Sequence, residues 1–256
     1  MRVKRMNKKS IQEGIENIVR ESVERINDNL KAIISVGSIN NEDFVEGLSD
    51  IDLLYVLGHI NSGLLKVIHD LRNDGSEYTG YKVDIKPFTL TEFSAAVKGV
   101  GSFEFFTGWG LEMIRSGKQP CLYRSSDFPL DYQIDEERFK QDALERAHYY
   151  ITKLRKVISS DEPLLIRGEK KVVSGDELLK VAGSSVKNVL RFCLAYQGVQ
   201  TDGTTSILAQ SQKCLGDIQE IAVFLASRDQ KHFDREMMLK AYDLTEKIYQ
   251  TVIQNA

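Results

Sequence analysis

The sequence has little of what stabilises secreted proteins or anchors membrane proteins. Its three cysteines, Cys121, Cys193 and Cys214, are far apart and show no C-x-x-C spacing. We therefore expect reduced thiols and no disulfide framework. No run of about 18 apolar residues occurs, which predicts that no helix spans a membrane. The basic N-terminus is not followed by the apolar core of a signal peptide. Together these absences predict a cytoplasmic protein with no membrane partner.

The sequence also has few histidines and no excess of positive charge, and both facts exclude some classes of function. The four histidines are scattered, and none has the spacing of a zinc site or an obvious partner for a catalytic triad. The net charge is −3. A protein that grips long nucleic acid through its phosphates is usually basic, so long nucleic acid is not an expected partner.

The apolar pattern in the first half of the chain predicts short strands separated by helices. The 256 residues are enough for one large domain or two of ordinary size. Alternating or continuous apolar stretches predict strands at 31–36, 50–57, 81–88 and 121–123. The helix that follows Gly63 is predicted to end in a turn at Asn73-Asp74-Gly75.

The second half changes to a helical period and keeps it. An aperiodic segment around Pro129 separates the two halves. Helices are then predicted through 139–154, 179–193, 206–215 and 237–252, and Asp217 with Glu220 is predicted to cap the start of one more. We therefore predict an α+β chain. Residues 1–128 form a domain with a small mixed sheet and helices, and residues 129–256 form an all-α helical bundle.

Two aspartates on one predicted strand are the first candidates for chemistry. Successive side chains of a strand point to opposite faces, so Asp50 and Asp52 share a face while Ile51 and Leu53 point to a core. Adjacent carboxylates repel each other unless positive charge lies between them. Since nothing cationic lies nearby in the sequence, we interpret the pair as a site for magnesium. An isolated Asp-x-Asp is also common on ordinary surface strands.

The residues before and after this pair favour a site over a plain surface strand. Gly37-Ser38 ends the preceding strand, and glycine lets backbone N–H groups approach a phosphate. Ser38 alternatively caps a helix that starts near Asn40. Asp84 lies on the third strand and can join the pair if that strand lies beside the second one. The alternative is a solvated strand face that Asp84 shares with Lys82 and Lys86.

The order of these features resembles that of the polymerase β-like nucleotidyltransferase superfamily. The resemblance covers about residues 30–90 and is carried by Gly37-Ser38, Asp50, Asp52 and Asp84. It implies that Asp50 and Asp52 bind magnesium, and that Asp84 assists the metal and deprotonates an acceptor hydroxyl. Two magnesium ions are expected, because paired ions clamp the entering and leaving oxygens of a phosphoryl displacement.

The helical half resembles the C-terminal domain of streptomycin/spectinomycin-type aminoglycoside adenylyltransferases. The similarity runs from Asn188 to Gly198. It implies that Lys187 and Arg191, which share a polar stripe at helical spacing, contact the triphosphate. The alternative is that the stripe is a solvated helix face. That type carries a glutamate in place of Asp84 and typically a lysine within 199–205, where this sequence has none.

The expected activity is transfer of AMP from ATP to a hydroxyl of a small molecule, such as an aminoglycoside, with release of pyrophosphate. Two alternatives stay open. One is an antitoxin-type nucleotidyltransferase that modifies a protein partner, and the other is a non-catalytic module that binds a nucleotide or a partner. The sequence does not predict the oligomeric state.

Overall fold

The computed structural model describes residues 8–41, 43–44, 49–100, 106–159, 165–166, 169–170, 175–229 and 234–256. The chain divides into two compact units, Met1–Ile134 (unit 1) and Asp135–Ala256 (unit 2). The two-domain organisation predicted from the sequence, with its boundary after residue 128, stays a prediction.

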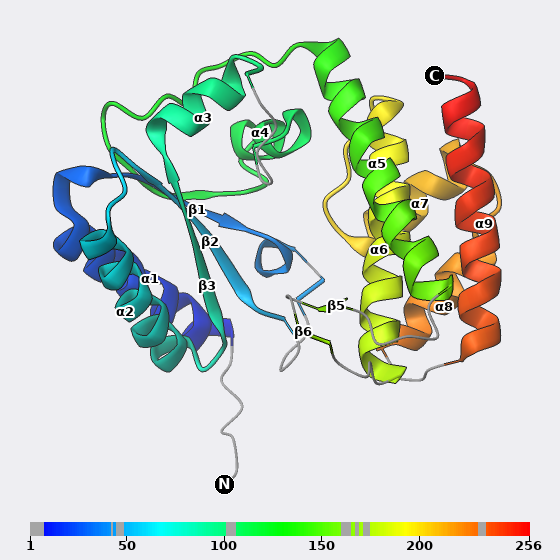
Figure 1. Cartoon of the computed structure of the whole chain (residues 1–256), viewed down its shortest axis with the longest axis horizontal. Helices are drawn as coiled ribbons and strands as arrows, with labels where there is room; N and C mark the ends of the chain where they lie inside the picture. Colours follow the sequence, from blue (N-terminus) through cyan, green and yellow to red (C-terminus); the bar gives the residue numbers. More distant parts are fainter. Residues whose placement is uncertain are drawn as a thin grey trace, which may run out of the picture. The chain divides into compact units, whose positions relative to one another are not determined.

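Unit 1 is built around a four-stranded mixed sheet (Figure 1). Its described elements are α1 (Lys8–Ile26), η1 (Asn27–Asn29), β1 (Leu30–Val36), η2 (Ser38–Asn40), β2 (Ile51–Leu57), α2 (Ser62–Thr79), β3 (Val83–Thr89), α3 (Leu90–Val97), α4 (Gly108–Arg115) and β4 (Cys121–Arg124). The strand order is β3-β2-β1-β4, in which β2 and β3 are parallel and the other pairs antiparallel. The predicted α+β class and the predicted strands of the first half are therefore confirmed, although β3 continues through Pro87 to Thr89.

The sheet is buried on both faces because its strands carry apolar residues on both. Ile51, Leu53 and Tyr55 of β2 pack into a core with α1 and α2. Leu54 and Val56, on the opposite face, pack into a second core with α3, α4 and Phe128. Burial of apolar surface on both sides fixes the position of β2 within the sheet.

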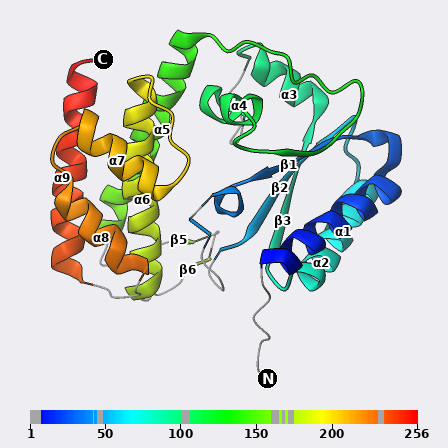
Figure 2. The ribbon, with the colours of Figure 1, turned by 180° about the vertical axis from the view of Figure 1, so that it is seen from behind.

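Helices α1 and α2 lie side by side on one face of the sheet, as both ribbon views show (Figures 1 and 2). A Cβ atom on Gly14 of α1 would lie 2.9 Å from the backbone oxygen of Tyr78, and one on Gly75 of α2 would lie 2.8 Å from Cδ1 of Ile18. The predicted turn at Asn73-Asp74-Gly75 is wrong, since α2 continues through it to Thr79. Gly75 permits the close approach of the two helices and does not end the helix.

Unit 2 consists mainly of long helices. Its described elements are α5 (Glu136–Ser159), β5 (Leu165–Ile166), β6 (Glu169–Lys170), α6 (Gly175–Tyr196), α7 (Thr204–Cys214), α8 (Gln219–Asp229) and α9 (Arg235–Gln254). The antiparallel pair β5–β6 corrects the prediction of an all-α unit. A strand of two residues is too short to show an alternating pattern, so the sequence around β5 and β6 predicted only helices.

Polar contacts as well as apolar packing join α5 to α9. His148 Nδ1 lies 2.7 Å from the hydroxyl of Tyr249, and Arg155 forms an ion pair with Glu246 at 2.5 Å. On the α5–α6 side, Tyr150 stacks on Phe192. None of the described helices combines the length and the apolar character needed to cross a membrane.

Candidate active site

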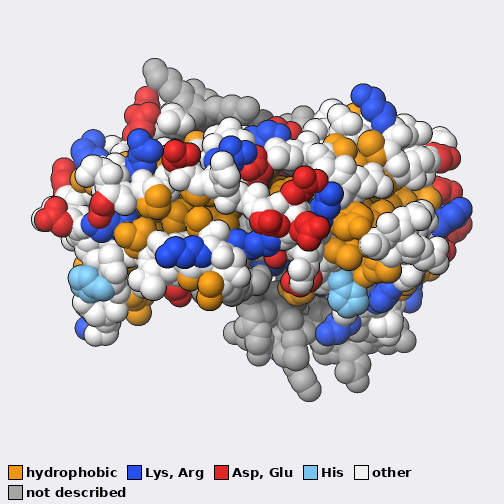
Figure 3. Space-filling model, turned by 90° about the horizontal axis from the view of Figure 1, so that it is seen from above, with side chains coloured by type: hydrophobic (Ala, Val, Ile, Leu, Met, Phe, Trp, Pro, Cys, Tyr) orange, Lys and Arg blue, Asp and Glu red, His pale blue; other side chains and the backbone are white. Residues whose placement is uncertain are grey.

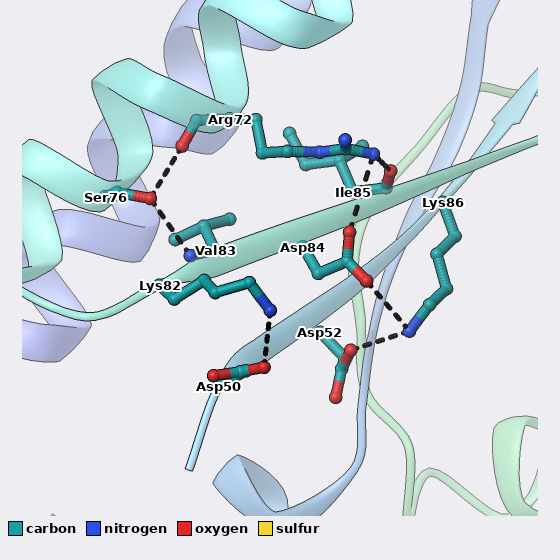
Figure 4. Close-up of polar contacts among 9 residues, drawn as sticks. All are labelled: Asp50, Asp52, Arg72, Ser76, Lys82, Val83, Asp84, Ile85 and Lys86. Carbon is teal, nitrogen blue, oxygen red and sulfur yellow. Dashed lines mark hydrogen bonds and ion pairs between the residues drawn. The ribbon is translucent and has the colours of Figure 1, made fainter. Parts of the chain in front are cut away.

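The parallel pairing of β2 and β3 brings the three predicted acids to one face of the sheet (Figure 4). Asp52 and Asp84 are register partners, so they are direct neighbours across the two strands. Asp50 lies one residue before β2, where the backbone N–H of Ile51 donates to the carbonyl of Lys82 at 2.9 Å. Side chains alternate along a strand, so Asp50 and Asp52 lie on the same face of the sheet as Leu54 and Val56. Leu54 and Val56 are part of the apolar core, and the two acids lie beyond its end.

Two lysines from β3 and the residue before it contact these acids. Lys82 Nζ lies 2.6 Å from Asp50 Oδ2, and Lys86 Nζ lies 2.7 Å from Asp52 Oδ1. Lys86 also reaches Asp84 Oδ2 at 3.4 Å. Nothing cationic lies near Asp50 and Asp52 in the sequence, but the fold brings these two lysines against them, so a metal is not needed to place positive charge beside the pair. The lysines are distant in sequence but adjacent in space, because the register of β3 places them beside β2.

Lys86 is the central cation of the group. Its side chain is only 26% exposed, and that of Asp52 is 29% exposed. Burial lowers the pKa of Lys86, but the hydrogen bond and charge of Asp52, together with the charge of Asp84, outweigh it and raise the pKa above its ordinary value. Lys86 is therefore charged at neutral pH and bridges two carboxylates from two strands.

Arg72 of α2 holds the other side of Asp84. One guanidinium nitrogen, Nη2, donates to the carbonyl of Ile85 and lies 3.5 Å from Asp84 Oδ1. Since β3 is at the edge of the sheet, the carbonyl of Ile85 has no strand on that side and accepts from the arginine instead. Ser76 of α2 adds a second link between α2 and β3, because its hydroxyl accepts a hydrogen bond from the N–H of Val83 at 3.1 Å (Figure 4).

The turn after β1 brings backbone against Asp52. Gly37 has φ +82°, and a Cβ atom there would lie 3.1 Å from Asp52 Oδ2. With ψ at −157°, this backbone conformation is open to glycine and nearly closed to residues that carry a Cβ atom, which explains the residue at this position. Ser38 begins the short helix η2, and the prediction that it caps a helix near Asn40 is wrong.

Ser35 and Asn40 hold the turn in place. The hydroxyl of Ser35 donates to Asn40 Oδ1 and the Asn40 amide donates to the carbonyl of Ser35, both at 2.8 Å. This reciprocal pair fixes the two ends of the Gly37-Ser38 segment. Neither residue belongs to the motif recognised in the sequence.

The carboxylate oxygens at this face are of the ligand type that magnesium prefers. Asp52 and Asp84 offer carboxylate oxygens side by side, and magnesium in enzymes is often held by one or two carboxylates together with substrate phosphates and water. Among the described residues, no three acidic, histidine or cysteine side chains come together in an arrangement that could hold a metal ion by themselves. Lys82 and Lys86 contact the same carboxylates that a metal would use. Magnesium stays a predicted cofactor.

Lys187 and Arg191 lie on α6 of unit 2, and both are partly buried. The guanidinium of Arg191 donates to Asn188 Oδ1 at 2.9 Å. The residue is therefore not on the fully solvated helix face that was the alternative for this stripe. Contact of Lys187 and Arg191 with a triphosphate stays a prediction.

No family model matches the sequence, and no curated protein matches it. Among solved structures, the chain is similar to spectinomycin adenyltransferase AAD(9) from Enterococcus faecialis, which was solved with ATP and spectinomycin. The TM-score is 0.54 and the identity 12%, over 94% of this chain and 99% of that one. The likeness establishes the fold. An adenyltransferase-like fold is thus shown for the chain, whereas the roles of individual residues stay predictions.

The surface adds a weaker observation about partners. On the face drawn in Figure 3, described acidic and basic side chains are interspersed on each unit. The expectation that long nucleic acid is not a partner depends on the net charge of −3 and stays a prediction.

Proposed function

We propose that this protein is a magnesium-dependent nucleotidyltransferase that transfers AMP from ATP to a hydroxyl group of a small molecule and releases pyrophosphate. The observation that carries the proposal is the register pair Asp52–Asp84, with Asp50 on the same face and the Gly37 turn against Asp52. The likeness to an adenyltransferase solved with ATP and spectinomycin supports the same class of reaction.

The reaction requires one bond to form and one to break at the α-phosphorus of ATP. The acceptor oxygen attacks this phosphorus, and the bond from the α-phosphorus to the oxygen that bridges to the β-phosphate breaks. The bridging oxygen leaves with the electron pair as part of pyrophosphate. The hydroxyl proton of the acceptor must pass to a base. Asp84 is our candidate because its contacts with Arg72 and Lys86, at 3.5 and 3.4 Å, are longer than the lysine contacts of Asp50 and Asp52.

The other residues bind and orient the triphosphate. Asp52 and Asp84, assisted by Asp50, would hold magnesium, which when bound neutralises charge on the phosphates and the leaving group. The backbone N–H groups of the Gly37-Ser38 turn are the candidate donors to phosphate oxygens. Lys187 and Arg191 are further candidates for phosphate contact, as the family resemblance implies.

We favour an aminoglycoside-like acceptor, because the similar structure contains spectinomycin. The test is incubation of the protein with each labelled nucleoside triphosphate, magnesium and a panel of acceptors that includes spectinomycin, streptomycin and intact proteins. Mass spectrometry then identifies the modified acceptor, and pyrophosphate is measured in parallel. We expect one acceptor–AMP adduct for each pyrophosphate released.

Two variants give the assay a matched comparison. Asp52→Asn removes a site carboxylate, whereas Asp127→Asn removes a carboxylate that pairs with Lys31 elsewhere in unit 1. Only Asp52→Asn should abolish transfer. An adduct on a protein in place of a small molecule would favour the antitoxin-type alternative. ATP binding without any transfer, across the whole panel, would favour the non-catalytic module.

A further inference from the structure

Lys86 contacts the same oxygens that a metal ion at this site would need. Its Nζ lies 2.7 Å from Asp52 Oδ1 and 3.4 Å from Asp84 Oδ2. Magnesium binds carboxylate oxygens at about 2.1 Å, so an ion shared by the two aspartates would lie against the ammonium group. A divalent ion and an ammonium group in contact repel strongly, and in a partly buried site solvent screens that repulsion less than in water.

The neighbouring cations differ in how easily they leave the acids. Arg72 is anchored by its hydrogen bond to the backbone of Ile85 as well as by Asp84. The ammonium groups of Lys82 and Lys86 instead reach carboxylates of Asp50, Asp52 and Asp84. A lysine ammonium on its four-carbon stem reorients by rotation about single bonds, whereas the planar guanidinium is held in a fixed fork.

We propose that Lys86 is a phosphate-binding residue that is transferred from Asp52 and Asp84 to the triphosphate when the metal and nucleotide bind together. This inference rests on the proposed function, because it needs a triphosphate at the site. A bare divalent ion must displace the ammonium group of Lys86 from Asp52 and Asp84 and brings no anion to accept it, so it binds poorly. A metal–triphosphate complex brings oxygens that accept the ammonium, so it binds well. The same transfer frees Asp84 Oδ2 to receive the acceptor proton.

Lys82 is expected to behave in the same way to a smaller extent. Among the described residues its one ion pair is with Asp50, and its side chain is 50% exposed, compared with 26% for Lys86. Solvent therefore screens its charge more, and a metal at Asp52 and Asp84 would feel it less. Replacement of Lys86 is therefore expected to change the metal affinity more than replacement of Lys82.

The test measures binding and not turnover, using manganese as a paramagnetic substitute for magnesium. Binding of manganese alone is followed by electron paramagnetic resonance in the wild type, Lys86→Met, Lys82→Met and Lys31→Met. Binding of the manganese complex of α,β-methylene ATP is followed by calorimetry. Lys31 is the matched control, since it pairs with Asp127 and lies roughly 17 Å along β1 from Val36, the register partner of Asp52. Circular dichroism checks folding, and Lys86→Gln replaces Lys86→Met if the latter does not fold.

The expected result is a change of opposite sign in the two titrations. Lys86→Met should bind manganese alone about tenfold or more tightly than the wild type, because a unit charge beside the ion is removed. It should bind the manganese–nucleotide complex about tenfold more weakly, because a charge-assisted contact to phosphate is lost. Lys82→Met should change less, and Lys31→Met should match the wild type.

The outcomes separate this inference from the proposed function. If the wild type binds the complex and Lys86→Met binds manganese alone no more tightly than the wild type, the nucleotide site stands and the role of Lys86 is overturned. If neither the wild type nor any variant binds manganese or the complex, the proposed function fails and the inference fails with it.

Discussion

Every acid of the candidate site has a cation within contact distance. Asp50 pairs with Lys82, Asp52 with Lys86, and Asp84 with both Lys86 and Arg72. The side chains in these pairs are between 26% and 50% exposed, so each pair contributes little to the free energy of unfolding. This arrangement keeps three carboxylates close together without large repulsion. It therefore supports a binding function more than a stabilising one.

Replacement of Asp52 separates these two roles. Asp52→Asn should lower the rate of nucleotide transfer by roughly 10²–10⁴, because a proposed metal ligand is lost. The free energy of unfolding should change by less than about 1 kcal/mol, since the pair with Lys86 is partly exposed. Turnover with labelled ATP and denaturant unfolding measure the two quantities. Near-normal turnover in this variant would exclude a mechanism that uses the carboxylates of Asp50 and Asp52.

Gly37 provides a second test at the scale of a single residue. Gly37→Ala should cost about 1–3 kcal/mol of stability, because a backbone at φ +82° and ψ −157° is strained for a residue with a Cβ atom. The new Cβ would also lie 3.1 Å from Asp52 Oδ2 and displace it, so transfer should fall as well. Denaturant unfolding and turnover measure the two effects.

Gly117 supplies the control for this variant. It has a similar φ of +74°, but a Cβ atom there would meet nothing within 4 Å. Gly117→Ala should therefore also lose stability, because its φ is positive, but it should keep its activity. Equal loss of activity in both variants would show that backbone strain, and not contact with Asp52, is responsible.

The residues of the site were predictable only where one strand contains the whole pattern. Alternation along β2 correctly predicts that Ile51, Leu53 and Tyr55 face a core. The pairing of Lys82 with Asp50 and of Lys86 with Asp52 depends on the register between β2 and β3, which no local pattern states. Lys82, Asp84 and Lys86 do alternate on one face of the third strand. Combined with the assumption that this strand lies beside β2, that signal would have placed the lysines at the acids.

At the scale of elements, the crossing of α1 and α2 explains why a turn predicted from local residues did not form. Asn73-Asp74-Gly75 favours a turn when local preference decides. Here, the side chains of Ile68 and Leu71 pack in the core between α2 and the sheet. Gly75, which has no side chain, leaves room for Ile18 of α1. The helix instead ends at Gly80, with φ +69° and its N–H donating to the carbonyl of Ser76. Tertiary packing thus outweighed the local signal.

Gly14 tests this packing. In an isolated helix Gly→Ala is stabilising by roughly 1 kcal/mol. Gly14→Ala should nevertheless destabilise this protein by about 1–3 kcal/mol, since the Cβ would lie 2.9 Å from the backbone oxygen of Tyr78 and α2 would have to shift. Denaturant unfolding measures the change. Glu13→Ala, on an exposed position of the same helix, is the control and should be nearly neutral. A more stable Gly14→Ala protein would contradict the close approach of α1 and α2.

At the scale of the whole molecule, the fold is shared with a protein to which the sequence is only 12% identical. Such a likeness is possible because packing requires apolar side chains of suitable size at core positions and not particular residues. The periods of two and 3.6 therefore predicted most strands and helices of both halves. The same tolerance explains why the acceptor is not predictable from the fold, since substrate contacts depend on individual residues.

The last prediction concerns Arg191 of unit 2 and its predicted contact with the triphosphate. Arg191 is partly buried on α6, and its guanidinium donates to Asn188. If it binds the triphosphate, Arg191→Ala should raise the KM for ATP about tenfold, the loss expected for a charge-assisted hydrogen bond. Arg191→Lys should recover part of that loss, because it keeps the charge but not the planar fork. Lys240→Ala, at an exposed residue of α9 that pairs with Glu236, should leave the KM unchanged.

The melting temperature distinguishes binding from structure in this series. A residue that binds nucleotide should change the KM while the melting temperature of the protein without nucleotide stays close to that of the wild type. A residue that only supports α6 should lower the melting temperature through the lost contact with Asn188 and leave the KM unchanged. If Arg191→Ala changes the free energies of both binding and unfolding by no more than about 0.5 kcal/mol, as an ordinary surface substitution does, the predicted role of Arg191 is wrong.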